Sequence, residues 1–260
     1  MVLQALEPFA AEPERSALLF DVDGTLAPIV VDPDSAAVPA STRELLEALV
    51  GRYALVACIS GRQALEARRI VGIDSIAYVG NHGLELLAPD ALEPVTDPAL
   101  EPLADAVGSF VRNAYTPELE KLGARIEDKD AIWSLHWRGA ADEDAVQEAL
   151  RPVAAEADQQ GLVPHWGRKI LEIRPPFAAD KGTAVVAALE GRTPARALYA
   201  GDDTTDLDAF RKLRALQDEG RLDALCVGVR SAEGPEAIER EADVVVDGPE
   251  GISELLEALI

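Results

Sequence analysis

The chain is poor in basic residues. Its 260 residues include 24 Lys and Arg against 47 Asp and Glu, which gives a formal net charge of -23. Nucleic acids and anionic membranes bind proteins through a basic surface, so neither is expected as a partner. A chain this acidic can bind a phosphate monoester only where a divalent cation and a few Lys and Arg residues concentrate positive charge locally.

Cysteines and long apolar runs are also scarce. The two cysteines, Cys58 and Cys226, each lie within an apolar stretch, which predicts buried free thiols rather than a disulfide or a metal site. No apolar run reaches the length of about 20 residues that a membrane-spanning helix needs. Residues 1–16 lack the basic start and apolar stretch of a signal peptide. We therefore expect a cytoplasmic protein without a membrane partner, and nothing in the sequence implies a protein partner.

Apolar strand-like runs alternate with amphipathic helical stretches in the first and last thirds of the chain. This alternation predicts an α/β fold, with a doubly wound parallel sheet that is covered by helices on both faces. The strand-like runs are 16–21, 54–60, 75–80, 196–201, 222–229 and 243–247.

The middle of the chain follows a different order. One helix and two strands are expected, then a second helix and two more strands, with proline-rich segments on both sides. This order is typical of a small α+β unit inserted into the α/β frame. The predicted division is a discontinuous core of residues 1–97 and 176–260, with an inserted domain of residues 98–175.

Four polar clusters stand at the carboxyl ends of predicted strands. In an open α/β sheet, ligands bind at that edge, so these side chains are expected to converge. The clusters are Asp21–Thr25 (DVDGT), Ser60–Arg62, Asn81–Gly83 and Gly201–Asp206.

The chemistry of these residues indicates phosphoryl transfer. Asp21, Asp23 and Asp202 would repel one another unless a cation lies between them, and their hard oxygen ligands favour Mg²⁺. A carboxylate beside that ion can act as a nucleophile, and a second one can protonate the leaving oxygen and then activate water. Lys181, at a helix start, supplies a positive charge for the phosphate, and Ser60 supplies a hydroxyl.

The order of these motifs resembles the haloacid dehalogenase superfamily. The resemblance implies that superfamily's core fold and a covalent mechanism, with Asp21 as nucleophile and Asp23 as acid and base. It also implies Mg²⁺ as cofactor, bound by Asp21, Asp202 and the carbonyl oxygen of Asp23. Asp203 and Asp206 would support these ligands.

Further blocks across both predicted domains look like the trehalose-6-phosphate phosphatases. They are SGR at 60–62, GNHGLE at 80–85, EDK at 127–129, SLHWR at 134–138, EIRP at 172–175, DKG at 180–182 and GDDTTD at 201–206. The resemblance implies a Mg²⁺-dependent phosphoric monoester hydrolase that acts on a small sugar phosphate, trehalose 6-phosphate. The insert then corresponds to that family's cap domain, which closes over the substrate.

Sugar recognition is expected from polar side chains of both domains. Glu127 and Lys129 are two residues apart on a predicted strand and would share one face of it, where Glu172 could join them. His136 and Trp137 are expected to pack inside the insert. By the resemblance, the substrate-binding residues are Arg62, Asn81, His82, Glu127, Lys129 and Glu172.

One position departs from the family's pattern. The family usually continues the acidic motif with Glu-Asp-Ala-Phe, whereas this chain has Leu207–Phe210 (LDAF). On a helix, Leu207 would point away from Asp206, so the change is expected to affect metal affinity rather than the reaction.

Three other functions remain open at this point. The chain could hydrolyse another sugar phosphate, such as sucrose phosphate, mannosyl-phosphoglycerate or a hexose phosphate. It could be a non-catalytic sensor of a sugar phosphate, although a pure binder has no use for a nucleophile beside an acid. A phosphomutase would pass the phosphoryl group to a second sugar hydroxyl instead of water.

Overall fold

The chain divides into two compact units. The computed structural model describes residues 2–30, 32, 35–231 and 234–260. Contacts group Met1–Val95 with Ala179–Ile260 as one unit and Thr96–Ala178 as the other, so the second unit is an insertion in the first. These limits differ from the expected insert of 98–175 by two or three residues at each end.

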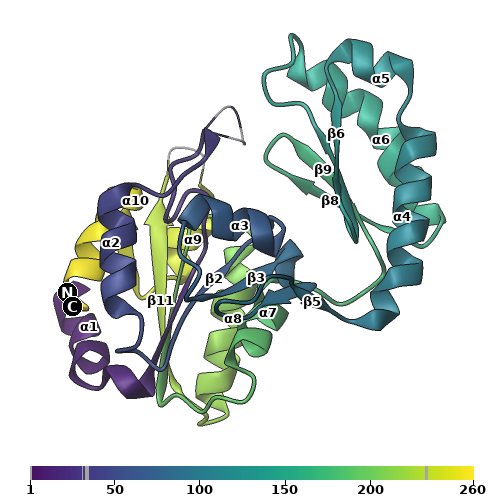
Figure 1. Cartoon of the computed structure of the whole chain (residues 1–260). Helices are drawn as coiled ribbons and strands as arrows, with labels where there is room; N and C mark the ends of the chain where they lie inside the picture. Colours follow the sequence, from purple (N-terminus) through teal and green to yellow (C-terminus); the bar gives the residue numbers. More distant parts are fainter. Residues whose placement is uncertain (1, 31, 33–34, 232–233) are drawn as a thin grey trace. The chain divides into compact units, whose positions relative to one another are not determined.

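The first unit is built on an eight-stranded, mostly parallel sheet (Figure 1). Its strand order is β12-β11-β10-β1-β2-β3-β4-β5, and β1 lies near the centre with parallel neighbours on both sides. Only β4 is added antiparallel to β3 among the pairings described. The prediction of a doubly wound parallel sheet is confirmed. The strands are β1 (Ser16–Phe20), β2 (Leu55–Ile59), β3 (Ala77–Gly80), β4 (Glu85–Leu87), β5 (Val95–Thr96), β10 (Arg196–Gly201), β11 (Asp223–Arg230) and β12 (Val244–Asp247).

Helices cover both faces of this sheet, which explains why its strands are apolar throughout. On β1, Leu18 and Phe20 face one apolar cluster, whereas Ala17 and Leu19 face the other. The first cluster includes side chains of α1 (Val2–Ala11), α2 (Ala40–Leu49), α3 (Ala64–Val71) and α10 (Gly248–Glu257). The second includes side chains of α7 (Lys181–Leu189), α8 (Asp206–Asp218) and α9 (Glu236–Glu241).

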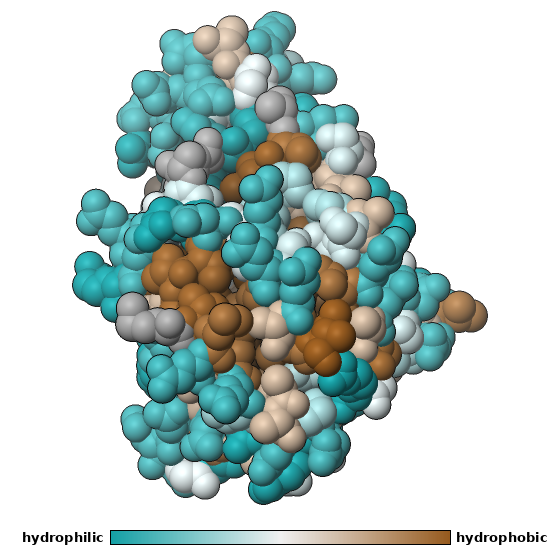
Figure 2. All heavy atoms as spheres, turned by 90° about the vertical axis from the view of Figure 1, so that its left-hand side faces the viewer, coloured by the Kyte–Doolittle hydropathy of each residue, from teal (hydrophilic) through white to brown (hydrophobic). Residues whose placement is uncertain are grey.

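Both ends of the chain contribute to the face that carries α1, α2 and α10. Figure 2 shows apolar side chains gathered among polar ones on that side. Leu3 and Ile260 are 71% and 49% exposed there, while the hydroxyl groups of Thr42 and Ser253, 2.8 Å apart, join α2 to α10.

The two cysteines are free and buried, as predicted. Burial raises the pKa of Cys226 to about 12, so its thiol stays protonated at neutral pH. A helix that is both long enough and apolar enough to cross a membrane is absent from the described part of the chain.

The second unit packs helices on one face of a four-stranded antiparallel sheet of order β6-β7-β9-β8. Leu135 and Leu171 point from the sheet into an apolar cluster, together with Val107 and Leu150 from the helices. The other face of the sheet, which we call the polar face, carries mainly polar side chains such as Glu127, Ser134 and Glu172. The elements are α4 (Glu101–Ala114), α5 (Pro117–Leu122), β6 (Arg125–Lys129), β7 (Ile132–His136), α6 (Glu143–Gln159), β8 (Val163–Gly167) and β9 (Ile170–Arg174), preceded by a 3₁₀ turn at Pro98–Leu100.

Candidate active site

The four predicted polar clusters follow four neighbouring strands, β10, β1, β2 and β3. Asp21 comes directly after β1, and its amide donates a hydrogen bond to the carbonyl of Ala200 on β10 at 2.9 Å. Asp202 comes directly after β10. Ser60 follows β2 in the same way, and its amide donates to the carbonyl of Val79 on β3 at 2.9 Å. Since these strands are parallel, their carboxyl ends bring these residues to one edge of the sheet.

Lys181 enters this edge from the first turn of α7. Asp180 caps the helix, because its carboxylate accepts from the amide of Thr183 while the Thr183 hydroxyl accepts from the amide of Asp180. The cap fixes where the helix begins. The Lys181 ammonium lies 2.6 Å from Asp21 Oδ1 and 2.6 Å from Asp206 Oδ1, and the residue is only 3% exposed.

Asp206 is fully engaged by its neighbours. Its Oδ1 accepts from Lys181 and from the hydroxyl of Tyr199, both at 2.6 Å. Its Oδ2 accepts from the amides of Asp202 and Asp203, at 2.9 and 2.8 Å. A carboxylate has about four acceptor positions, so these bonds occupy them all. Asp206 therefore positions Lys181 and the loop after β10.

The buried cluster carries an excess of negative charge. Oxygens of Asp21, Asp202 and Asp206 lie within 4.8 Å of one another, and with Lys181 they make a formal charge of -2. Burial raises the pKa of Asp21 well above its usual value; Lys181 lowers it, whereas Asp206 and Asp202 raise it further. Burial opposes the Lys181 ammonium, but Asp206 and Asp21 outweigh it and raise its pKa. A divalent cation would neutralise the remaining charge.

Glycine at position 24 lets the DVDGT turn approach Asp202 closely. Gly24 has φ +88°, and a Cβ there would lie 2.4 Å from Asp202 Oδ2. Its amide donates to the carbonyl of Ala27 at 2.7 Å, which tightens the turn. The turn after β1 and the acidic loop after β10 are thus in direct contact. This set of hard oxygen donors, around a cradle that a side chain would fill, fits Mg²⁺.

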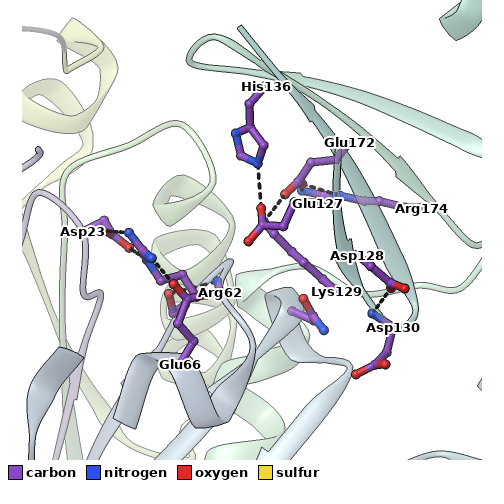
Figure 3. Close-up of polar contacts among 12 residues, drawn as sticks. Asp23, Arg62, Glu66, Glu127, Asp128, Lys129, Asp130, His136, Glu172 and Arg174 are labelled. Atoms are coloured by element: carbon purple, nitrogen blue, oxygen red, sulfur yellow. Dashed lines mark hydrogen bonds and ion pairs between the residues drawn. The ribbon is translucent and has the colours of Figure 1, made fainter. Parts of the chain in front are cut away.

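Asp23 is paired with Arg62 in this structure (Figure 3). Arg62 Nε and Nη2 donate to the two oxygens of Asp23 at 2.7 and 2.9 Å, and Nη1 donates to Glu66. Burial opposes the charge, but the hydrogen bonds to Asp23 and Glu66 outweigh it and raise the pKa of Arg62. Glu66 lies in the first turn of α3, so its pair with Arg62 joins the loop after β2 to this helix.

The Asn81–Gly83 turn packs against the Ser60–Arg62 loop. Asn81 and His82 have φ of +47° and +56°, a conformation that costs side-chain-bearing residues about 1 kcal/mol or more each. The amide of His82 donates to the carbonyl of Ser60 at 3.0 Å. The imidazole of His82 packs so closely on Gly61 that a Cβ added to Gly61 would lie 2.7 Å from the ring. The side-chain amide of Asn81 donates to Glu85. The turn therefore orients the loop that carries Ser60 and Arg62.

In the second unit, the predicted sugar-binding residues lie on the polar face of the sheet. Glu127 pairs in register with Ser134, which pairs with Glu172, so these side chains share one face. Lys129 is two residues after Glu127 on β6 and lies on the same face. Its ammonium is 3.3 Å from Glu172 Oε1 and 3.6 Å from Glu127 Oε2.

Two basic residues that the sequence pattern did not assign to a site extend this row of polar side chains (Figure 3). Arg174 donates to Glu172 Oε2 from Nε at 3.0 Å and from Nη2 at 2.6 Å. His136 Nε2 lies 2.6 Å from Glu127 Oε2. The expectation that His136 packs inside this unit is wrong, because alternation along β7 turns it to the polar face. Trp137, by contrast, is 1% exposed in the apolar cluster, as expected.

Leu207 points away from the acidic cluster, as its helical position predicts. It is 5% exposed and belongs to an apolar cluster with Phe210 and Val185. The side chain that replaces the family's usual carboxylate therefore packs in the core.

The fold is shared with solved structures of a class of hydrolases. The structure is similar to a haloacid dehalogenase-like hydrolase from Bacteroides thetaiotaomicron, with a TM-score of 0.66 at 17% identity over 94% of this chain and 99% of that one. It is also similar to the C-terminal domain of trehalose-6-phosphate phosphatase from C. albicans, with a TM-score of 0.80 at 23% identity over 100% and 97% of the two chains.

The sequence comparison narrows this class to one family. The sequence model of trehalose-phosphatase matches residues 19–241. A trehalose-phosphate phosphatase from Mycobacterium marinum is 36% identical over 224 residues, which are 80% of this chain and 54% of the relative. The chain therefore belongs to the trehalose-phosphatase family, and it spans about half the length of this relative.

Proposed function

We propose that this protein hydrolyses trehalose 6-phosphate to trehalose and phosphate in the cytoplasm. One observation carries the proposal: Asp21, Asp202 and Asp206 form a buried cluster around the Lys181 ammonium at the carboxyl edge of a parallel sheet. Family membership and the name of the M. marinum relative support this substrate.

Asp21 is the nucleophile in this proposal. Its carboxylate oxygen attacks phosphorus to form an aspartyl-phosphate, and the bond from phosphorus to the sugar oxygen breaks. Lys181, at 2.6 Å, holds this carboxylate in place, and Asp206 holds Lys181. Asp23 gives its proton to the departing sugar oxygen and then takes one from the water that hydrolyses the aspartyl-phosphate. Both Asp21 and Asp23 leave the cycle as they entered it.

Asp21, Asp202 and the carbonyl oxygen of Asp23 would hold Mg²⁺ in this proposal, with Asp203 and Asp206 as support. The ion would supply charge stabilisation for the phosphoryl oxygens. Arg62 is placed to release Asp23 and donate to the substrate, since its side chain is 14% exposed and its guanidinium pairs with Asp23 of the DVDGT turn. Ser60, Asn81 and His82 line or orient the same edge.

Sugar recognition is assigned to the polar face of the second unit. A disaccharide presents many hydroxyl groups, which need donors and acceptors at fixed positions. Glu127 and Glu172 supply acceptors and Lys129 supplies a donor, all on one face of a rigid antiparallel sheet. The arrangement suits a ligand with several hydroxyl groups better than a bare phosphate ester.

Phosphate release over a panel of sugar phosphates with Mg²⁺ tests the proposal. The panel contains trehalose 6-phosphate, sucrose phosphate, mannosyl-phosphoglycerate and hexose phosphates. We expect the highest kcat/KM for trehalose 6-phosphate. Faster turnover of another member would replace the substrate, binding without turnover would indicate a sensor, and an isomeric sugar phosphate as product would indicate a mutase.

A further inference from the structure

On the polar face of the second unit, the contact of His136 with Glu127 is 2.6 Å long, as short as the contact of Arg174 with Glu172. His136 stands on β7 at the position diagonal to Glu127, which is directly opposite Ser134. Long side chains in diagonal positions on one face of a sheet can touch. Because an ionised carboxylate only accepts hydrogen bonds, Nε2 of His136 must carry the proton that Glu127 Oε2 accepts.

His136 and Lys129 compete for the same oxygen of Glu127. Oε2 lies 2.6 Å from His136 Nε2 but 3.6 Å from Lys129 Nζ, which exceeds ordinary hydrogen-bond length. The imidazole therefore determines where the carboxylate lies. Without it, Glu127 could rotate toward Lys129 and shorten their 3.6 Å ion pair to a direct hydrogen bond, which would turn both groups away from a ligand.

Glu172 lies on β9, two strands away from Glu127 on β6, and it is held by a basic side chain in the same way. Arg174 donates to its Oε2 twice, whereas Lys129 lies 3.3 Å from its Oε1. Each carboxylate on this face is thus fixed from the side by a basic residue, with Lys129 between the two.

We propose that His136 is a positioning residue for sugar recognition: its Nε2–H holds the Glu127 carboxylate beyond hydrogen-bond distance of Lys129, so that the two groups meet the sugar as separate acceptor and donor. This inference rests on the proposed function, in which Glu127 contacts a sugar hydroxyl. His136 itself does not touch the substrate.

Two substitutions separate this role from a structural one. His136→Phe keeps a planar ring without the donor, and His136→Gln places an amide donor close to the position of Nε2. We measure kcat and KM with the best sugar phosphate of the panel and with p-nitrophenyl phosphate, which has no sugar. His136→Phe is expected to raise KM for the sugar phosphate about tenfold at nearly constant kcat, and His136→Gln is expected to restore most of it. Both variants should hydrolyse p-nitrophenyl phosphate like the parent protein.

A double-mutant cycle with Glu127→Ala gives the decisive readout. If His136 acts only through Glu127, His136→Phe has no further effect on KM in the Glu127→Ala background. A full effect in that background would show direct sugar contact and overturn the proposal, as would equal losses on both substrates or no change in KM. Because the best member of the panel serves as substrate, failure of trehalose 6-phosphate would refute the proposed function without deciding the role of His136.

Discussion

The two polar clusters of this chain differ in how their charges are held. In the first unit, Asp21, Lys181 and Asp206 are at most 4% exposed, and they come from the loop after β1, from α7 and from α8. In the second unit, Glu127 is 39% exposed at its side chain, and its partners stand on the same sheet face. The first cluster is a buried network of ion pairs and hydrogen bonds. The second is a row of side chains that is exposed to solvent at Glu127.

This difference matches the two tasks that we propose for the clusters. Charge that develops during phosphoryl transfer is best stabilised by groups that are fixed before the reaction in a dry site. When a sugar binds, its hydroxyl groups replace hydrogen bonds to water by hydrogen bonds to the protein. A row of donors and acceptors that is partly exposed to solvent is sufficient for such binding. Substitutions should therefore affect rate and stability in the first cluster and binding in the second.

The largest effect is expected for Asp21→Asn. The change removes the carboxylate nucleophile at nearly constant volume, so kcat should fall by about 10⁴-fold or more. Phosphate release measures the rate, and circular dichroism and thermal unfolding serve as controls for the fold. If the variant kept a tenth of the parent rate, Asp21 could not be the nucleophile.

The second largest effect is expected for Asp206→Asn, which removes a carboxylate from the buried network of the first unit. An amide cannot accept from Lys181, Tyr199 and two backbone amides together, so buried donors lose their partner. We expect the free energy of unfolding in urea to fall by about 3 kcal/mol.

Asp208→Asn is the matched control on the same helix. Asp208 pairs with Arg211 at 2.8 Å, but the two side chains are 38% and 60% exposed. Its loss should change stability by less than about 0.5 kcal/mol. Equal effects of the two substitutions would contradict the contrast between buried and open charge.

Glu127→Ala should act on binding instead. Removal of a charged acceptor for a sugar hydroxyl is expected to raise KM for the disaccharide phosphate about 20-fold, with little change in kcat. KM for p-nitrophenyl phosphate should stay the same. Asp128→Asn removes one charge from the adjacent residue, which faces the other side of β6, and should leave both substrates unaffected. A matching rise of KM for p-nitrophenyl phosphate would remove Glu127 from the sugar site.

Much of the core site could be predicted because topology alone brings strand ends together. The alternation of apolar runs and helices indicates parallel strands, and polar residues after such strands must share one edge. This reasoning predicts that Asp21, Ser60, Asn81 and Asp202 share an edge, and period two predicts that Glu127 and Lys129 share one face.

Other features of the structure could not be predicted from the sequence pattern. Tyr199 reads as an apolar strand residue, yet its hydroxyl reaches Asp206 at 2.6 Å, because only the packing of α8 on β10 brings them together. His136 stands between Leu135 and Trp137, so its neighbours in sequence favour packing in the core, whereas the strand turns His136 to the opposite face. The helix α1 contains Pro8, a residue that is disfavoured in helix interiors, so the sequence pattern does not predict it.

The smallest effect is expected for a substitution of Glu66. Its ion pair with Arg62 is partly exposed, so it is more similar to the polar row of the second unit than to the buried network of the first. Its side chain is 21% exposed, and a neutral glutamine would still accept from Arg62 Nη1. We expect Glu66→Gln to lower kcat/KM about threefold. Arg62→Lys should lower it further, because an ammonium cannot bind both oxygens of Asp23 in the geometry of a guanidinium. If Glu66→Gln lowered kcat/KM more than Arg62→Lys, Glu66 would itself contact the substrate. Glu66 on α3 would then be a substrate-binding residue rather than a residue that supports Arg62.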